Sequence, residues 1–511
     1  MDNILKYLEK TAERFPDKTA VDDGTVQFTY QELLDKARHF GLSFLDKTMP
    51  GRPVAILREK SSEVLAAMFG IVYAGCFYVM IDPEQPLERL KDILSVLKTD
   101  LVLTDSTYKN QLEDAGYQGE IYLLDQERTE ASLTEQDIEK LMERRSTADS
   151  ADLLYGIFTS GSTGKPKCVA VSQQAVIDFI GHFTKQFEIT DQDRIANQAP
   201  FDFDVSVKDI YTGLLTGAKV QIIPREYFSD PTTLMDYMAD SKMTVLTWAV
   251  SAMCFVSIMN GFGYRVPTAI RQVLFSGEVM PIKHLNKWKA ALPQARFVNL
   301  YGPTEITCNC TYYILPDRVF APEEVLPIGH AFPNEKVFLL DENDRLVTEP
   351  GQAGELCVSG TALALGYYAD PARTAQAFTQ NPLNTRWYER IYRTGDLARC
   401  DAAGDFYYIG RKDFQIKHMG HRVELGEIEA AAMRCDAVTR ACCIFDAEKQ
   451  RLHLFYTGSC EKAALLAALK TTLPPFMQPN TALQLDELPM NKNGKIDRTA
   501  LAALTKKGAR K

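Results

Sequence analysis

Short apolar runs alternate with helical patterns along the chain from residue 54 to residue 300. Runs at 54–57 and 77–81 have the length of buried strands, and apolar residues recur with a helical period in the segments that begin at Ser62 and Glu88. Strands separated by helices of this length form right-handed βαβ units with parallel strands. Further runs of strand length lie at 101–103, 121–124, 220–223, 245–247, 272–275 and 297–300. The sequence therefore predicts an α/β fold with mostly parallel sheets.

The pattern changes in the last third of the chain. Short strands at 337–341 and 356–358 are separated by Gly, Pro and Asp turns, which favours a small β subdomain. Beyond Asp413 we expect a helix at 424–433, a β-hairpin across 441–456 and a helix at 463–473. About a hundred residues of this kind can form a core of their own. We therefore predict an N-terminal domain at 1–412 and an α+β C-terminal domain at 413–511.

Composition excludes several classes of protein. A chain of 511 residues with 46% hydrophobic and 24% charged residues is globular and too long for one ordinary core. Its net charge of −10 argues against a nucleic-acid partner. No apolar segment has membrane-spanning length, and the first residues lack the pattern of a signal peptide. Eleven dispersed cysteines suit free thiols, so we expect a cytoplasmic protein with no membrane span.

One loop between two apolar runs has the composition of a phosphate-binding loop. Hydroxyl residues, two glycines and two lysines follow the run at 153–158 and precede the run at 169–171. Backbone N–H groups, hydroxyls and ammonium groups together suit the oxygens of a polyphosphate. The loop is not a Walker A motif, because Pro166 follows Lys165 where that motif requires Ser or Thr. Its candidate phosphate ligands are Thr159, Ser160, Gly161, Ser162, Thr163, Gly164 and Lys165.

Four further motifs follow in order: Tyr-Gly-Pro-Thr-Glu at 301–305, Tyr-Arg-Thr-Gly-Asp at 392–396, Gly-Arg-Lys-Asp-Phe-Gln-Ile-Lys at 410–417 and Asn-Gly-Lys-Ile-Asp-Arg at 493–498. With the loop, they make the whole chain resemble the adenylate-forming superfamily, which includes adenylation domains of nonribosomal peptide synthetases, acyl-CoA synthetases and luciferases. The segments 197–204 and 275–279 are most similar to D-alanine–D-alanyl carrier protein ligases and related amino-acid-activating enzymes. The resemblance implies two doubly wound sheets and a small β subdomain in the N-terminal domain, and a mobile C-terminal domain.

The resemblance also implies where ATP and Mg²⁺ bind. The phosphate loop would hold the β- and γ-phosphates, and Thr304 and Glu305 the α-phosphate and Mg²⁺. Tyr301 would stack on adenine, Asn299 would meet its exocyclic amine, and Asp396 and Arg411 would lie at the ribose. Lys495 would bridge the reacting carboxylate and the α-phosphate, so the expected catalytic residues are Lys495, Thr304 and Glu305. Phosphate oxygens and one carboxylate are ligands that suit Mg²⁺.

The amino-acid pocket is likewise implied by resemblance. Asp204 would pair with the α-ammonium, and the side chain would be surrounded by Val205, Lys208, Ser251, Leu274, Ser276, Leu300, Cys308 and Asn309. The likeness to D-alanine ligases favours D-alanine or another small amino acid, although Ser276 stands where those ligases carry cysteine. Lys208 leaves an acidic substrate open, since a lysine that points into a small pocket needs an anionic partner. If Lys208 instead reaches solvent, the small-residue interpretation holds.

The favoured function is a stand-alone enzyme that adenylates an amino acid and then loads it, as a thioester, onto the phosphopantetheine of a separate acyl or peptidyl carrier protein. Between these steps the C-terminal domain would rotate about Asp413, with Lys417 and Gly420 facing the interdomain region. One alternative is an acyl-CoA synthetase, which would have no amine for Asp204 to neutralise. A second is a non-catalytic ATP-binding scaffold, against which the retention of Lys495, Glu305 and Asp396 argues.

Overall fold

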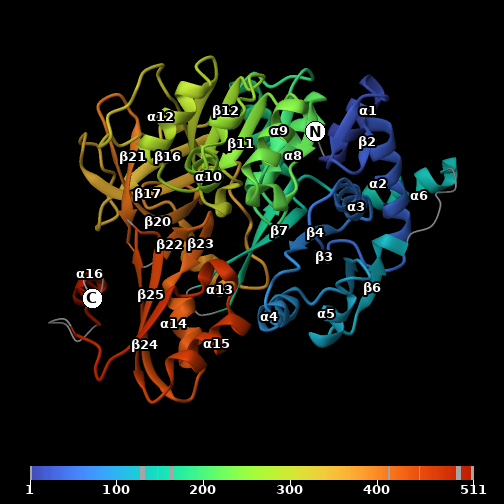
Figure 1. Ribbon diagram of the computed structural model, residues 1–511. Coiled ribbons are helices and arrows are strands. Elements are labelled where there is room, and N and C mark those ends of the chain that lie inside the picture. The colour runs from blue at the N-terminus through green and yellow to red at the C-terminus, as the bar shows by residue number, and fades with distance from the viewer. Residues whose placement is uncertain are drawn as a thin grey trace.

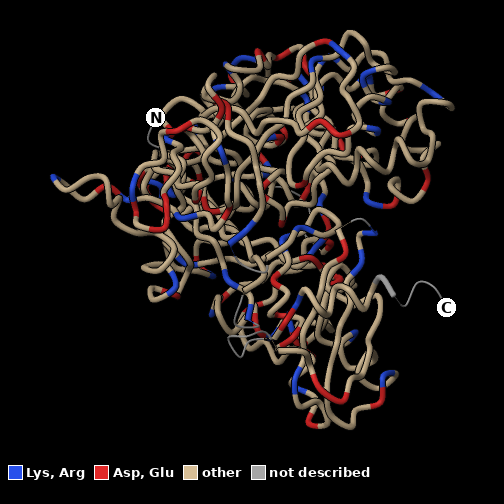
Figure 2. The backbone as a smooth tube through the Cα atoms, turned by 90° about the vertical axis from the view of Figure 1, so that its left-hand side faces the viewer, with Lys and Arg blue, Asp and Glu red and all other residues tan. Residues whose placement is uncertain are grey.

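The computed structural model describes residues 3–126, 133–146, 148–161, 165–412, 415–447, 449–490 and 496–507. A large body contains the first three sheets, and a smaller part formed by the last residues lies against one edge of it (Figure 1). Both signs of charge are interspersed along the trace of both parts (Figure 2). Within the described ranges, no helix combines the length and the apolar character that crossing a bilayer requires.

Two large sheets form the body. The seven-stranded sheet has the order β18 (Gly366–Tyr367), β8 (Lys167–Ser172), β7 (Leu153–Thr159), β4 (Phe77–Ile81), β3 (Pro53–Leu57), β5 (Leu101–Thr104), β6 (Glu120–Leu123). The nine-stranded sheet has the order β15 (His330–Ala331), β14 (Thr311–Ile314), β13 (Arg296–Tyr301), β12 (Gln272–Ser276), β11 (Val245–Ala249), β9 (Arg194–Asn197), β10 (Lys219–Ile222), β1 (Thr19–Asp22), β2 (Gln27–Thr29). The central strands of both sheets pair in parallel, and antiparallel strands lie at the edges.

Helices fill the layers around the sheets because successive strand residues face opposite sides. In β3, Val54 and Ile56 join the core shared with the other sheet, whereas Ala55 and Leu57 pack on the outer face. The shared core holds α1 (Leu5–Arg14), α2 (Tyr30–Phe44), α3 (Ser62–Tyr73), α7 (Gln173–Gln186) and α8 (Val205–Thr216). The outer faces are covered by α4 (Leu87–Leu97) and α5 (Lys109–Asp114) on one sheet, and by α9 (Pro231–Asp240), α10 (Val250–Ile258), α11 (Gly261–Tyr264) and α12 (Ile282–Ala291) on the other.

A hydrogen-bonded cap marks the start of α2, and short helices and turns connect other elements of the body. Thr29 caps α2: its side chain accepts from the backbone of Glu32, and the Glu32 side chain accepts from the backbone of Thr29. Between α5 and β7 lie the 3₁₀ turn Leu124–Gln126 and α6 (Glu135–Ser146). Two further 3₁₀ turns, Arg225–Ser229 and η3 (Thr304–Ile306), follow strands of the nine-stranded sheet.

The predicted β subdomain is an antiparallel sheet with the order β16 (Glu335–Leu340), β17 (Ala353–Gly360), β20 (Arg390–Cys400), β19 (Phe378–Gln380), and with β21 (Phe406–Arg411) paired to β20. The short helix α13 (Pro371–Ala377) precedes β19. This sheet brings the Asp396 motif on β20 beside Arg411 on β21.

The C-terminal part has two hydrophobic clusters made of its own residues. It contains the hairpin β22 (Gln415–His418) and β23 (His421–Glu424), then α14 (Leu425–Met433), β24 (Val438–Asp446), β25 (Arg451–Gly458), α15 (Lys462–Thr472), the 3₁₀ turn Pro475–Met477, β26 (Thr481–Gln484) and α16 (Arg498–Lys507). The predicted fold class, with large N-terminal and small C-terminal domains, is confirmed. The boundary at Asp413 stays a prediction, because Asp413 and Phe414 lie outside the described residues.

Candidate active site

The predicted ligands gather where strands of both sheets end. β12 ends at Ser276, β13 ends at Tyr301 and leads into η3, and β7 ends at Thr159. Open α/β sheets bind ligands outside the carboxyl ends of their strands, so the sheet topology itself places the site here. The β22–β23 hairpin of the C-terminal part lies over the same region (Figure 1).

Three residues expected at the nucleoside meet in one cluster. The hydroxyl of Tyr301 donates to Asp396, and the guanidinium of Arg411 donates to the other carboxylate oxygen of Asp396 at 2.8 Å. The side-chain nitrogen of Asn299 donates to the carbonyl of Pro327 at 2.7 Å. That bond fixes the amide so that its oxygen is the group able to accept from an amine. The structure thus brings Tyr301, Asp396 and Arg411 together, and the roles of all four residues toward ATP stay predictions.

Glu305 is fully buried and is surrounded by cations. Its carboxylate accepts from Lys167 at 3.1 Å, from the hydroxyl of Tyr367 at 2.8 Å and from Arg422 at 2.9 and 2.7 Å. Burial alone would raise the pKa of Glu305, but the charges of Arg422 and Lys167 and the Tyr367 hydrogen bond hold that pKa well below its ordinary value. Burial, together with the charge of Arg422, lowers the pKa of Lys167 to about 8. Glu305 is therefore an ionised carboxylate built to face a cation.

The described part of the phosphate loop is engaged by the C-terminal domain. The Ser160 hydroxyl donates to the carbonyl of Arg422 at 2.7 Å, and the Gly161 N–H donates to Glu427 at 3.1 Å. Gly161 has to be glycine, because a Cβ there would lie 2.1 Å from the carbonyl oxygen of Lys165. Lys165 is exposed, and the buried hydroxyl of Thr159 has no hydrogen-bond partner within the described part of the chain. Ser162, Thr163 and Gly164 lie outside the described residues.

Asp204 immediately precedes α8, at the end of an ordered loop. The ammonium of Lys60 fixes this loop by donating to the carbonyls of Asn197, Gln198 and Ala199 and to the Asn197 side chain, at 2.7 to 3.3 Å. Burial raises the pKa of Asp204, while a hydrogen bond from Thr304 and the charge of Lys208 oppose that rise. Asp204, predicted to bind the amino acid, and Thr304, predicted to bind ATP, line the same cavity.

Lys208 points inward. Its side chain is 1% exposed, and its ammonium donates to the side-chain oxygen of Asn309 at 2.7 Å. The possibility that Lys208 reaches solvent is therefore wrong, because α8 is buried between the two sheets at this turn. The thiol of Cys308 donates to the carbonyl of Asp204 at 2.8 Å. The other predicted pocket residues are buried or half-buried around the same strand ends: Val205, Ser251, Leu274, Ser276 and Leu300.

The tip of the β22–β23 hairpin reaches this pocket. The N–H of Gly420 donates to Glu278 at 2.7 Å, and a Cβ on Gly420 would lie 3.2 Å from the Ser251 hydroxyl. Gly420 also has φ +81, which favours glycine. The structure therefore agrees with the expectation that Gly420 faces the interdomain region. Lys495 and Asp413 lie outside the described residues.

The sequence did not identify the groups around Glu305. Lys167 stands on β8 next to the buried Cys168 and Val169. A lysine within a strand of buried residues indicates a buried anionic partner, and this pattern could have pointed to Lys167. Arg422 had no such signal, because it reaches Glu305 only through the packing of the two domains. No group of three or more His, Cys, Asp or Glu side chains in the described ranges could hold a metal ion.

Comparison with known proteins decides the family. The model of the AMP-binding enzyme family matches residues 8–368, and that of the AMP-binding enzyme C-terminal domain matches residues 427–495. The chain belongs to the AMP-binding enzyme family.

Members of this family are adenylate-forming ligases, and relatives of the chain include nonribosomal peptide synthetases. Tyrocidine synthase 1 of Brevibacillus parabrevis is 33% identical over 98% of the chain, which spans 45% of that synthase. Zwittermicin A synthase ZmaJ of Bacillus cereus is 33% identical over 98% of the chain and 95% of its own length. The solved structure of holo-PA1221, which contains adenylation and PCP domains, is 25% identical with a TM-score of 0.83, over 98% of this chain and 84% of that one.

Proposed function

We propose that this AMP-binding enzyme adenylates an amino acid with ATP and then transfers the aminoacyl group to the phosphopantetheine thiol of a carrier protein. The observation that carries the proposal is that Asp204 and Thr304 line one cavity between the domains. A carboxylate able to pair with an α-ammonium then lies in the same cavity as the motif expected at the α-phosphate. A carboxylate held between them is positioned for attack on phosphorus.

The residues present fit ATP and Mg²⁺. Glu305 offers an ionised carboxylate and Thr304 a hydroxyl, which are hard oxygen ligands. In the arrangement seen here Arg422 supplies the positive charge at Glu305, so Arg422 has to leave before a cation binds. When bound, Mg²⁺ would neutralise charge on the phosphates. Tyr301, Asp396 and Arg411 would hold the nucleoside, and Lys495 would join the site for adenylation.

A cavity between the domains supports thiol transfer. It is lined by Ser160, Phe203, Asp204 and Thr304 from the N-terminal domain, and by His421 and Phe476 from the C-terminal domain. A narrow, flexible thiol arm is a suitable occupant, because the cavity reaches Asp204 and Thr304. The solved relative that contains a PCP domain makes a carrier protein the favoured source of that arm.

Lys208 favours an acidic substrate. In the described ranges its ammonium has one hydrogen-bond acceptor, Asn309, although an ammonium has three donors. The Tyr155 hydroxyl is also fully buried and lies within electrostatic range of Cys308 and Asp204, and it has no hydrogen-bond partner among the residues that the structure describes. A buried ammonium and an unpartnered hydroxyl suit a side-chain carboxylate such as that of aspartate or glutamate. The alternative, D-alanine or another small amino acid, would add no acceptor for either group and would leave the ammonium with Asn309 alone.

Amino-acid-dependent pyrophosphate exchange tests the adenylation step. We expect exchange with glutamate or aspartate to exceed exchange with D-alanine, L-alanine and serine at equal concentration. Loading is then measured with a phosphopantetheinylated carrier protein and, in parallel, with coenzyme A. Exchange with non-amino carboxylic acids and transfer to coenzyme A would favour the acyl-CoA synthetase alternative. No exchange with any acid, despite ATP binding, would favour the non-catalytic scaffold.

A further inference from the structure

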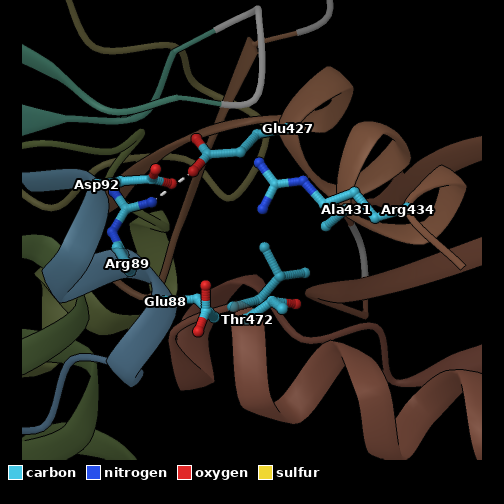
Figure 3. Close-up of a pocket in the computed structure, with 8 residues that line it drawn as sticks. Glu88, Arg89, Asp92, Glu427, Ala431, Arg434 and Thr472 are labelled. Carbon is cyan, nitrogen blue, oxygen red and sulfur yellow. Dashed lines mark hydrogen bonds and ion pairs between the residues drawn. The ribbon is translucent and has the colours of Figure 1, made fainter. Parts of the chain in front are cut away.

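Glu427 connects the two domains at the phosphate loop. It lies in the first turn of α14 and is 3% exposed. One of its carboxylate oxygens accepts from the Gly161 N–H at 3.1 Å, and the other pairs with the guanidinium of Arg89 on α4 (Figure 3). Arg89 is 7% exposed, so the ion pair is buried between α4 and the C-terminal domain.

We propose that Glu427 takes the place of a phosphate oxygen on the loop and, with Arg89, forms a latch that closes only when the loop holds no polyphosphate. The latch is this set: Glu427, Arg89 and the Gly161 N–H. The proposal rests on the proposed function, because it makes Arg89 and Glu427 positioning residues for the thiol-transfer arrangement.

Two observations besides the ion pair indicate competition with ATP. The Ser160 hydroxyl, a second predicted phosphate ligand, donates to the Arg422 carbonyl at 2.7 Å. The Arg422 side chain occupies both oxygens of Glu305, the predicted Mg²⁺ ligand. The latched arrangement therefore uses atoms that Mg-ATP needs, on both the loop and the carboxylate. Polyphosphate and the latch exclude one another because each requires the same donors.

Charge at the interface makes the latch respond to an anion. Glu88 and Asp92 lie beside Arg89 on α4, and Arg434 extends toward Glu427 from the opposite side (Figure 3). A buried ion pair is costly to break when one partner stays buried without the other. A polyphosphate that displaces Glu427 from Gly161 also separates the helices, so both partners return to water. Release of pyrophosphate would reverse this change and allow Gly420 to reach Glu278.

Binding of methylenediphosphonate with Mg²⁺ tests the proposal without catalysis or a carrier. This diphosphonate cannot support reversal of adenylation, and its affinity is measured by calorimetry for wild type, Glu427→Gln, Arg89→Met and Glu113→Gln. Glu113 is an exposed glutamate on α5 outside the latch, so it is the control. We expect the diphosphonate to bind at least fivefold more tightly to Glu427→Gln and Arg89→Met, and equally to Glu113→Gln. A merely structural role would weaken binding or leave it unchanged, and either result would overturn the proposal.

Hydrogen exchange of the backbone provides the second measurement. In the wild type, the diphosphonate should raise exchange in α14 and α4, and in Glu427→Gln exchange there should already be high without it. If the diphosphonate leaves hydrogen exchange in α14 and α4 of the wild type unchanged, the latch is refuted. Separate assays should show transfer to the carrier falling at least tenfold in Glu427→Gln, with pyrophosphate exchange within threefold of wild type. Loss of all amino-acid activation in wild type would count against the proposed function alone, because the binding and exchange results do not require it.

Discussion

The ammonium of Lys208 donates to the side-chain oxygen of Asn309 at 2.7 Å, inside the pocket that begins at Asp204. Burial lowers the pKa of Lys208, and nearby Asp204 and Asp209 oppose this change. A substrate carboxylate would add a further anion that keeps the ammonium charged.

Lys208→Met should therefore remove the preference for an acidic amino acid. We expect kcat/KM for glutamate or aspartate to fall tenfold or more, about 1.4 kcal/mol, with little loss for neutral substrates. Pyrophosphate exchange over a panel of amino acids measures this. Lys283→Met, which removes an exposed lysine on α12, is the control. Unchanged selectivity in Lys208→Met would discard the acidic substrate.

Lys495→Ala should nearly abolish adenylation while ATP still binds. Most predicted ATP ligands lie in the N-terminal domain, so the lost lysine acts mainly on charge that develops in the transition state. We expect kcat for pyrophosphate exchange to fall about 10²-fold or more, with a much smaller rise in KM. Lys492→Ala, three positions earlier in the same segment, should be near wild type. Retention of more than about a tenth of the activity would remove Lys495 from the mechanism.

Asp413→Pro should separate the two half-reactions. Proline fixes φ near −65°, so a hinge at this position would be held in one arrangement. We expect pyrophosphate exchange to survive better than transfer to the carrier thiol. Asp413→Ala keeps the backbone free and serves as the control. If both half-reactions fall equally in a folded Asp413→Pro protein, the hinge lies elsewhere.

His421 should make thiol transfer sensitive to acid. Its ring stacks on Phe476 at 3.7 Å between centroids and meets the edge of Phe203 at 5.2 Å. Burial, together with the charges of Arg225, Arg89 and His418, lowers the pKa of His421 to about 4. The folded pKa is below the ordinary value of about 6.5, so this contact is fully stable above that pH and weakens as pH falls toward 4.

The measurement is the ratio of carrier transfer to pyrophosphate exchange between pH 7.5 and pH 5. We expect the ratio to drop several-fold in the wild type and to stay flat in His421→Phe, which keeps an aromatic ring without a titrating nitrogen. His330→Phe changes an exposed histidine and should behave as wild type. An equal drop in His421→Phe would assign the acid sensitivity to another group.

Much of the fold could be predicted because it depends on local patterns. Short apolar runs predicted the strands that end at Ser276 and Tyr301, and the parallel pairing of these strands sets their ends side by side. The meeting of Tyr301 with Asp396, 95 positions away, followed from the order of the family's motifs. The parallel pairing of β26 with β25 had no signal of this kind, since it depends on how the C-terminal core closes.

The remaining site residues could not be predicted for a different reason. Arg422 and Glu427 contact the other domain, and their partners are set by how the cores of the two domains meet. The direction in which the Lys208 side chain points depends on whether a hydrogen-bond acceptor lies across the pocket. The side-chain oxygen of Asn309 is that acceptor. Sequence patterns report which side of a helix is buried, but they do not report which polar groups face each other there.

The ion pair of Arg89 with Glu427 joins positions 338 residues apart, on opposite sides of the predicted hinge. A chimera recombined at that hinge would inherit its glutamate from one parent and its arginine from the other. Exchange of C-terminal domains among members of the family should therefore succeed only when both parents carry compatible charges at these two positions. For engineers who assemble hybrid synthetases, compatibility would have to be matched at α4 as well as at the junction itself.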